Sequence, residues 1–249
     1  MSRRTKDVVA SKVHDIGEFI SNKVFLSLPF TPTQLNLASF FSIVIAAFLF
    51  SFGQFKFNFL ALFFIAIGTQ FDYADGVVAR ARKQTNRFGG WFDPFLDLIG
   101  QHLIFIGMCF GVLRNYEFNP FITFLCFFGF WSIALNNFIG KEFNRTFGFD
   151  SYVGHQDFND KFHAFRKISF FDSFLFNTVA PSSFIYFVLF TVRYFLLLGI
   201  VLNNMLLTVV LITFFGLLRA FLMIWAFVLY LREDTKHRVS KVLLEIEKK

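Results

Sequence analysis

The chain has 249 residues, of which 55% are hydrophobic and only 16% are charged, and phenylalanine alone supplies 44. Soluble domains carry about 25% charged residues, so this composition excludes a disordered chain and argues against an ordinary soluble globule. Two cysteines are too few for a disulfide scaffold or a cysteine-rich zinc module. A net charge of +7 would indicate nucleic-acid binding in a soluble protein, but the distribution of the charges favours another explanation.

The first residues combine basic side chains with apolar side chains at helical spacing. Val9, Val13, Ile16 and Ile20 fall on one helical face among several lysines and arginines. This pattern is typical of an amphipathic helix that lies on a membrane surface. We therefore expect a juxtamembrane amphipathic segment within residues 1–30.

Six apolar stretches follow, and a helix needs about 20 such residues to cross a bilayer. They are Leu35–Phe52, Phe57–Tyr73, Trp91–Leu113, Phe121–Gly140, Ser182–Leu202 and Met205–Leu231. Strict apolar–polar alternation is absent, which argues against membrane strands, and a helix satisfies its own backbone polar groups in hydrocarbon. The sequence therefore predicts an all-α integral membrane protein, in which a surface helix precedes a six-helix transmembrane bundle within a single domain over residues 1–249.

The basic residues gather on one side of this predicted topology. Of the 24 lysines and arginines, 20 lie in the N-terminal segment, in the loops 80–90 and 141–172, or in the tail 232–249. By the positive-inside rule that side is cytoplasmic, so we expect both termini, including a charged tail, in the cytoplasm. Topology thus explains the basic charge, and no nucleic-acid partner is expected. We expect a multi-pass protein of a bacterial or archaeal cytoplasmic membrane.

Four aspartates lie in or beside the second and third stretches, whereas the other stretches contain no acidic residue. A charged residue within a span costs roughly 2.5–3.5 kcal/mol on the insertion scale, so such residues indicate function. Asp72 and Asp75 are three residues apart and share one helical face. Asp93 and Asp97, four residues apart, do the same. Both pairs are expected at the cytoplasmic ends of their helices, which makes this end the predicted active site.

Facing carboxylates repel one another unless cations lie between them. Mg²⁺ or Mn²⁺ suits such oxygen ligands, and two ions of this kind promote displacement at phosphorus. Gly76 would let a ligand approach the backbone closely, and Arg80 offers a planar fork of donors suited to a phosphate. The same acids could instead line an ion path through a carrier, although a carrier would favour acids near the midplane and internal repeats.

The pattern Asp72-x2-Asp75-Gly76-x2-Ala79-Arg80-x8-Gly89-x3-Asp93-x3-Asp97 resembles, position for position, the signature of the CDP-alcohol phosphotransferases, also called CDP-alcohol phosphatidyltransferases. The segment from Thr31 to Asn36 also resembles the family's TPN-x-x-T pattern, with Thr33 in place of Asn and Asn36 in place of Thr. Members of this family transfer a phospho-alcohol from a CDP-linked donor to a hydroxyl group and release CMP.

The resemblance implies a role for each matching residue. The metal ligands, for two ions of Mg²⁺ or Mn²⁺, would be Asp72, Asp75, Asp93 and Asp97. Asp97 would also accept the proton of the acceptor hydroxyl. The residues that would contact the CDP donor are Thr33, Gln34, Gly76, Ala79, Arg80, Asn86 and Gly89. The same likeness suggests a homodimer.

The resemblance leaves the substrates open. The commonest reaction in the family uses CDP-diacylglycerol as donor and a polar alcohol as acceptor, such as glycerol 3-phosphate, inositol or its phosphate, or serine. The alternative within the family moves a soluble CDP-linked head group onto a lipid or sugar alcohol, and the alternative outside it is a non-enzymatic membrane carrier. Lys141 and Arg145, four residues apart, would either contact the acceptor or be ordinary positive-inside flanking residues.

Overall fold

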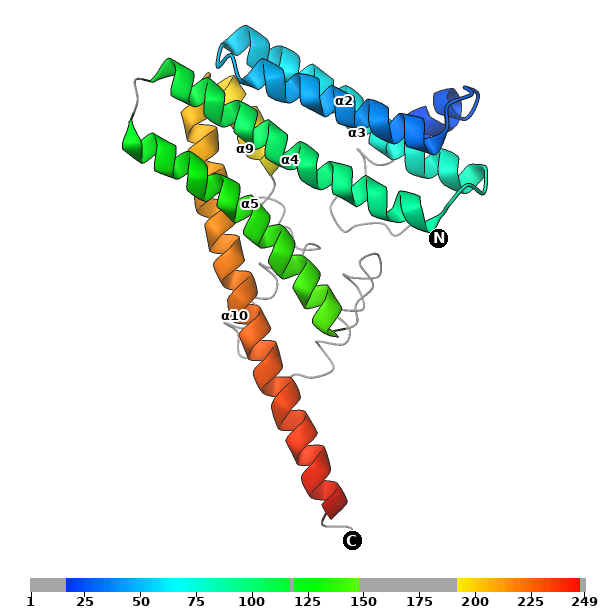
Figure 1. Cartoon of the computed structure of the whole chain (residues 1–249), viewed down its shortest axis with the longest axis vertical. Helices are drawn as coiled ribbons and strands as arrows, with labels where there is room; N and C mark the ends of the chain where they lie inside the picture. The colour runs from blue at the N-terminus through cyan, green and yellow to red at the C-terminus, as the bar shows by residue number, and fades with distance from the viewer. Residues whose placement is uncertain (1–16, 117–118, 148–191, 247–249) are drawn as a thin grey trace. The chain divides into compact units, whose positions relative to one another are not determined.

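A computed structural model describes residues 17–116, 119–147 and 192–246, and all regular structure within these ranges is helical (Figure 1). The elements are η1 (Ser21–Phe25), α2 (Pro32–Phe50), α3 (Phe55–Ala81), α4 (Arg87–Asn115), α5 (Pro120–Phe147), α9 (Val192–Val201) and α10 (Met205–Ile246). The chain divides into two compact units. The first comprises residues 1–131 and 192–213, and the second residues 132–191 and 214–249. Each unit is described by itself.

Within the described ranges, five helices are long and apolar enough to cross a membrane. Their candidate spans are Pro32–Phe50, Phe55–Ala81, Arg87–Asn115, Pro120–Ile139 and Met205–Trp225. They correspond to five of the six predicted spans, which confirms an all-α integral membrane fold. About half of the predicted span Ser182–Leu202, residues 182–191, lies outside the described residues. The other half contains the ten-residue helix α9.

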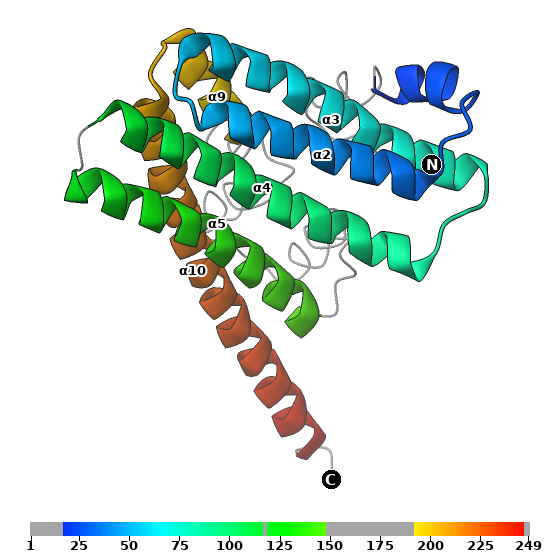
Figure 2. The same ribbon diagram turned by 45° about the horizontal axis from the view of Figure 1, so that its top comes forward.

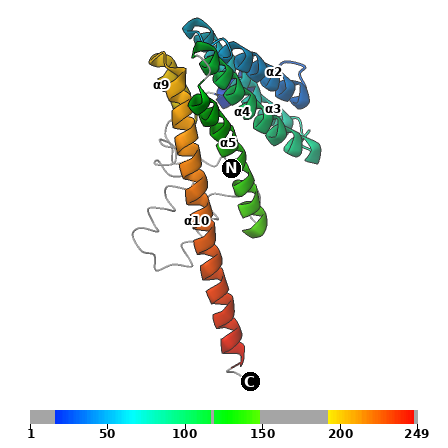
Figure 3. The same ribbon diagram turned by 60° about the vertical axis from the view of Figure 1, so that its left-hand side comes forward.

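The ends of the chain are described in part. Residues 1–16 of the predicted surface helix lie outside the described residues, whereas residues 17–25 are helical and include the π-helical turn η1. This segment packs on α3, because the Gln70 Nε2 group donates to the Gly17 carbonyl and to the Ser21 hydroxyl, each at 3.1 Å. At the other end, α10 continues as one helix from the last span into the charged tail, as far as Ile246 (Figure 3).

In the first unit, α2 packs along both α3 and α4 (Figure 2). The approach of α4 to α2 is close because glycines of α4 face backbone atoms. A Cβ atom at Gly107 would overlap the carbonyl oxygen of Ala47, and one at Gly111 would overlap that of Phe50. Small residues allow membrane helices to pack backbone against backbone in this way, so this contact places the α4 carboxylates beside α2.

We expect Gly107→Ala to destabilise the fold by about 1–3 kcal/mol or more, because the added methyl group meets backbone rather than a movable side chain. The measurement is thermal unfolding of the detergent-solubilised protein. Gly90→Ala is the matched control, since a Cβ atom there meets nothing within 4 Å and alanine favours helix. Equal melting temperatures for the two variants would contradict this account of the α2–α4 contact.

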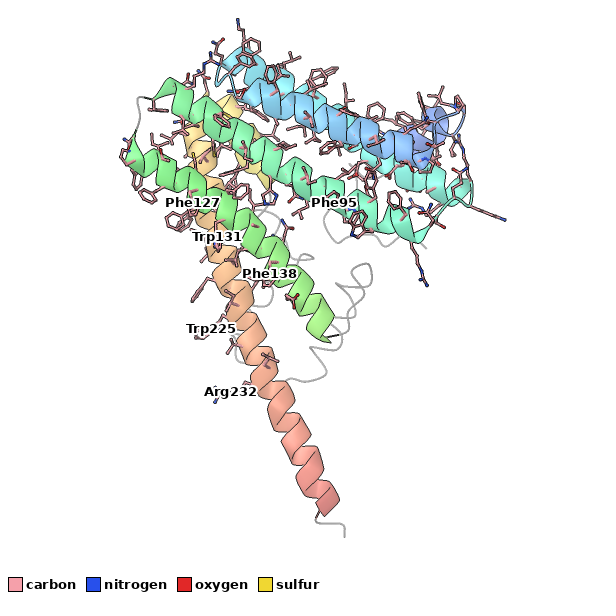
Figure 4. The ribbon with its side chains drawn as sticks, in the orientation of Figure 1. Phe95, Phe127, Trp131, Phe138, Trp225 and Arg232 are labelled. Atoms are coloured by element: carbon pink, nitrogen blue, oxygen red, sulfur yellow. The ribbon has the colours of Figure 1, made fainter. Side chains whose placement is uncertain are left out.

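In the second unit, α5 and α10 are joined through Asn136. Its Nδ2 group donates to the carbonyls of Ser132 and Gly216, each at 2.7 Å. Outward-facing aromatic side chains are frequent on these two helices. Among those labelled in Figure 4, Phe138 is 63% exposed and Trp225 47% exposed. Such surfaces suit contact with lipid, in keeping with the apolar composition.

Candidate active site

The first turn of α2 is defined by local sequence. Thr31 caps the helix: its hydroxyl accepts from the Gln34 backbone N–H at 3.2 Å, while the Gln34 side-chain oxygen accepts from the Thr31 N–H at 2.9 Å. Pro32 occupies the first helical position, where its fixed φ and missing N–H are tolerated. Leu35, on the same turn, belongs to an apolar cluster with Phe25, Ala74 and Val78. The beginning of α2 is thereby held against the end of α3.

Arg82 strengthens this attachment. Its guanidinium group donates to the carbonyl oxygens of Leu26, Leu28 and Phe30, at 3.2, 2.6 and 2.6 Å. These carbonyls belong to the segment just before α2, whereas Arg82 follows the last residue of α3. The Arg82 side chain thus holds the segment that leads into α2 against the end of α3. It therefore limits how far the beginning of α2 can move from the end of α3.

The turn between α3 and α4 is short and locally specified. Lys83 takes a left-handed conformation, with φ 56°, which reverses the chain after α3 as helix C-caps commonly do. The Gln84 N–H then donates to the Ala79 carbonyl at 2.8 Å. Asn86 caps α4, because its side-chain oxygen accepts from the Gly89 N–H at 2.7 Å. The end of α3 and the beginning of α4, which both bear aspartates, therefore lie on the same side of the first unit.

Asn36, on α2, forms hydrogen bonds to both the end of α3 and the beginning of α4. Its side-chain Nδ2 group donates to the Asp75 Oδ2 atom at 3.1 Å and to the Asp93 Oδ1 atom at 2.6 Å. Since both bonds share one nitrogen, the two carboxylate oxygens lie no farther apart than the two bond lengths combined. Asn36 is 6% exposed, whereas Asp75 and Asp93 are partly exposed. The three residues, from α2, α3 and α4, thus form a partly buried polar contact.

The other two predicted ligands flank this pair. Asp97 lies one turn beyond Asp93 on α4, is exposed, and adds its negative charge to that of Asp93 in repelling Asp75. Asp72 precedes Asp75 by three residues on α3 and is partly exposed. In the described part of the chain, no group of three or more carboxylate, imidazole or thiol side chains lies close enough together to hold a metal ion. The structure therefore joins Asp75 with Asp93 and leaves the complete ligand set of four aspartates as a prediction.

The predicted donor-binding residues lie at the beginnings of α2 and α4 and near the end of α3. The Arg80 guanidinium folds back along α3, such that a Cβ atom at Gly76 would lie 3.2 Å from its Nη1 atom. Ala79 is partly exposed and Thr33 exposed. Gln34, Asn86 and Gly89 all take part in the helix caps described above. Gly76, Ala79 and Arg80 thus follow Asp75 on α3, and Asn86 and Gly89 precede Asp93 at the beginning of α4. Thr33 and Gln34 lie in the first turn of α2, just before Asn36. Their predicted contacts with a donor stay a prediction.

The predicted acceptor residues Lys141 and Arg145 lie on α5, in its last two turns. Their side chains are outside the described residues. Their predicted role therefore rests on spacing alone.

The residues of the Asp75–Asp93 contact fit a hard divalent cation. All the atoms that could bind one are oxygens, which Mg²⁺ and Mn²⁺ prefer. Two carboxylates from different helices already face each other, and a neutral amide offers them hydrogen bonds but no compensating charge. The oxygen-only chemistry of the pair is therefore suited to a cation bound between α3 and α4.

The family model that describes the CDP-alcohol phosphatidyltransferases matches residues 28–154, which includes all four aspartates and both helix ends. The chain belongs to the CDP-alcohol phosphatidyltransferase family. The resemblance inferred from the aspartate pattern is thus confirmed, and with it membership of an enzyme family of phosphotransferases. The matched region contains the whole of α2, α3 and α4, which bear Asn36 and the four aspartates.

Two curated relatives were found for this CDP-alcohol phosphatidyltransferase. An archaetidylinositol phosphate synthase from Pyrococcus horikoshii is 30% identical over 112 residues, which cover 45% of this chain and 56% of the relative. A bifunctional IPC transferase and DIPP synthase from Aquifex aeolicus is 26% identical over 144 residues, which cover 52% of this chain and 32% of the relative. The matched regions thus span about half and a third of these relatives.

The contact of Asn36 with Asp75 and Asp93 in this CDP-alcohol phosphatidyltransferase is not apparent from the sequence, in which Asn36 stands out only as a departure from the family's threonine. A signal was present, because an asparagine one turn into an apolar span is costly to bury without a hydrogen-bond partner. What could not be read from the sequence was which of the polar residues on other helices supplies that partner.

Proposed function

We propose that this protein transfers a phospho-alcohol from a CDP-linked lipid, most simply CDP-diacylglycerol, to the hydroxyl of a polar alcohol, with release of CMP. The observation that carries the proposal is the meeting of Asp75 and Asp93 at the motif ends of α3 and α4, inside the region that the family model matches. A phosphorylated inositol is the acceptor to test first, because archaetidylinositol phosphate synthase is the name of one relative.

The four aspartates are the residues that would hold Mg²⁺ or Mn²⁺. When bound, such ions would offset the negative charge of the donor's diphosphate during transfer. Arg80 would bind a phosphate oxygen through its planar guanidinium. Gly76, beside it on α3, would leave room for the donor.

Asp97 is the proposed general base. Its carboxylate would accept the proton of the acceptor hydroxyl. The hydroxyl oxygen would then form a bond to the β-phosphorus of the donor, while the bond from that phosphorus to the CMP oxygen breaks. CMP would leave as the product, and the proton would stay on Asp97 until it passes to water. Asp97 is exposed, which leaves it accessible to both acceptor and solvent.

Two basic residues, on the side that the charge distribution predicts to be cytoplasmic, favour an anionic acceptor. Lys141 and Arg145 are four residues apart on α5, a spacing that places both on one helical face. We propose that they bind the phosphate of the acceptor. A neutral acceptor such as inositol or serine would not need them.

The topology proposed from the charge distribution puts this end of the spans, and both termini, in the cytoplasm. The donor's lipid part would then reach the site from the bilayer and the polar acceptor from water. A homodimer in a bacterial or archaeal cytoplasmic membrane, with residues 1–249 as one domain, completes the proposal.

The test is CMP release by the purified protein in detergent. We expect release from CDP-diacylglycerol only when an alcohol is present, and mass spectrometry of the lipid product identifies which alcohol of a panel was used. CMP release from soluble CDP-linked head groups with a lipid acceptor would instead support the reversed polarity. No CMP release from either class of donor, by protein with an intact melting transition, would favour a carrier and contradict the proposal.

A further inference from the structure

Asn36 is the one uncharged side chain described between the two carboxylates of the proposed metal site. It lies on α2, whereas Asp75 and Asp93 lie on α3 and α4. Its Nδ2 group donates to both, at 3.1 and 2.6 Å. The amide nitrogen therefore occupies the gap between the two carboxylates, which is the position where a cation would have the most favourable electrostatic energy.

The position of Asn36 is set by the structure around it. The capping box of Thr31 and Gln34 begins the helix one turn earlier, and Arg82 ties the preceding segment to the end of α3. Asn36 itself is 6% exposed. Its backbone is thus held in place, and the main freedom left to the side chain is rotation of its terminal amide, whose torsion is broad and roughly two-fold.

An amide has two chemically different ends, and this makes it suitable for a site that is filled and emptied. Its NH2 group donates hydrogen bonds to free carboxylates, and its carbonyl oxygen is an acceptor of the type that binds hard cations. A lysine or arginine here would form lasting ion pairs with Asp75 and Asp93 and would compete with a divalent ion. A neutral amide stabilises the carboxylates only modestly, so a divalent cation can displace it.

We propose that Asn36 belongs to the metal site: its Nδ2 group holds Asp75 and Asp93 together in the ion-free protein, and its Oδ1 oxygen joins the carboxylates as a ligand when a divalent cation binds. This inference rests on the proposed function, because it requires that the aspartates bind a cation. It also explains the departure from the family's threonine at this position, since asparagine keeps an oxygen ligand and adds the donor that pairs with the free carboxylates.

The test measures Mn²⁺ binding directly, from the loss of the free Mn²⁺ signal in electron paramagnetic resonance, and from the rise in melting temperature that a bound ligand causes. We expect Asn36→Leu to weaken Mn²⁺ binding about 10- to 100-fold, as loss of a residue that supports metal ligands does. We expect Asn36→Asp, which keeps the oxygens and lacks the donors, to melt at a lower temperature without Mn²⁺ and to bind Mn²⁺ at least as tightly as wild type.

Asn58→Leu is the matched control. Asn58 is likewise a buried asparagine within a span, 2% exposed, but it lies in the first turn of α3, far along that helix from Asp75. Its replacement should leave Mn²⁺ affinity unchanged. Asp75→Asn should remove most Mn²⁺ binding.

The outcomes separate the two proposals. Wild-type Mn²⁺ affinity in Asn36→Leu, or weakened affinity in Asn36→Asp, would overturn the ligand role of Asn36 and leave the metal site standing. Absence of Mn²⁺ binding by the wild type would overturn both the metal site and this inference. If Asn36→Leu does not fold, the Asn36→Asp variant decides the question by itself.

Discussion

Asp97→Asn is expected to lower CMP release by roughly 100-fold or more, the usual contribution of a positioned general base. The amide cannot accept the proton of the acceptor hydroxyl at neutral pH, so bond formation at phosphorus would have to proceed without that assistance. Asp97 is exposed on α4, one turn beyond Asp93, and its removal relieves repulsion of Asp75 rather than leaving a buried charge. The melting temperature should therefore stay close to that of the wild type.

The control for this experiment is Asp234→Asn, the same chemical change in the C-terminal part of α10, outside the aspartate pattern. It should leave the rate of CMP release unchanged. The measurement is turnover of purified protein at saturating donor and acceptor. If Asp97→Asn retained more than about a tenth of the wild-type turnover, the proton-acceptor role would be wrong.

Removal of divalent ions is expected to have the second large effect. Excess EDTA should reduce CMP release to background, because Asp75, Asp93 and Asp97 would then repel one another and the donor's diphosphate. Addition of Mg²⁺ or Mn²⁺ beyond the EDTA concentration should restore the rate. The loss should be reversible, since the helix caps and the α2–α4 contact do not depend on an ion.

EDTA that has been saturated with Mg²⁺ beforehand is the control, because it keeps the chelator and leaves the protein its ions. It should not reduce CMP release. Undiminished release in excess free EDTA would refute the metal site and, with it, the oxygen-ligand interpretation of the four aspartates. A loss that Mg²⁺ or Mn²⁺ cannot restore would indicate unfolding instead, which a parallel melting curve detects.

The two experiments together separate binding from proton transfer. A protein that still binds Mn²⁺ through the other three aspartates but fails to release CMP after Asp97→Asn has lost the base and kept the ions. Equal loss of Mn²⁺ binding would show that Asp97 acts mainly as a ligand. The exposed position of Asp97, outside the Asn36 contact, favours the first result.

The all-α membrane fold could be predicted because hydropathy is a local property. A run of apolar residues must form a helix in hydrocarbon whatever surrounds it, and five such runs became the candidate spans of the structure. The family could be predicted for a similar reason, since the spacing of Asp72, Asp75, Asp93 and Asp97 lies within 26 consecutive residues. The caps by Thr31 and Asn86 are equally local, because each pairs with a residue three positions later.

Only the tertiary structure decided which distant residues meet. Asn36 is 39 positions from Asp75 and 57 from Asp93, and Arg82 reaches carbonyls more than 50 positions earlier. Such contacts depend on how closely the helices approach, which glycines such as Gly107 determine through backbone packing. Composition and spacing contain no information on that approach, because in a uniformly apolar span every face is suited to burial. The sequence by itself thus determined the helices and the type of chemistry, and the packing of α2 between α3 and α4 decided which side chain lies between the carboxylates.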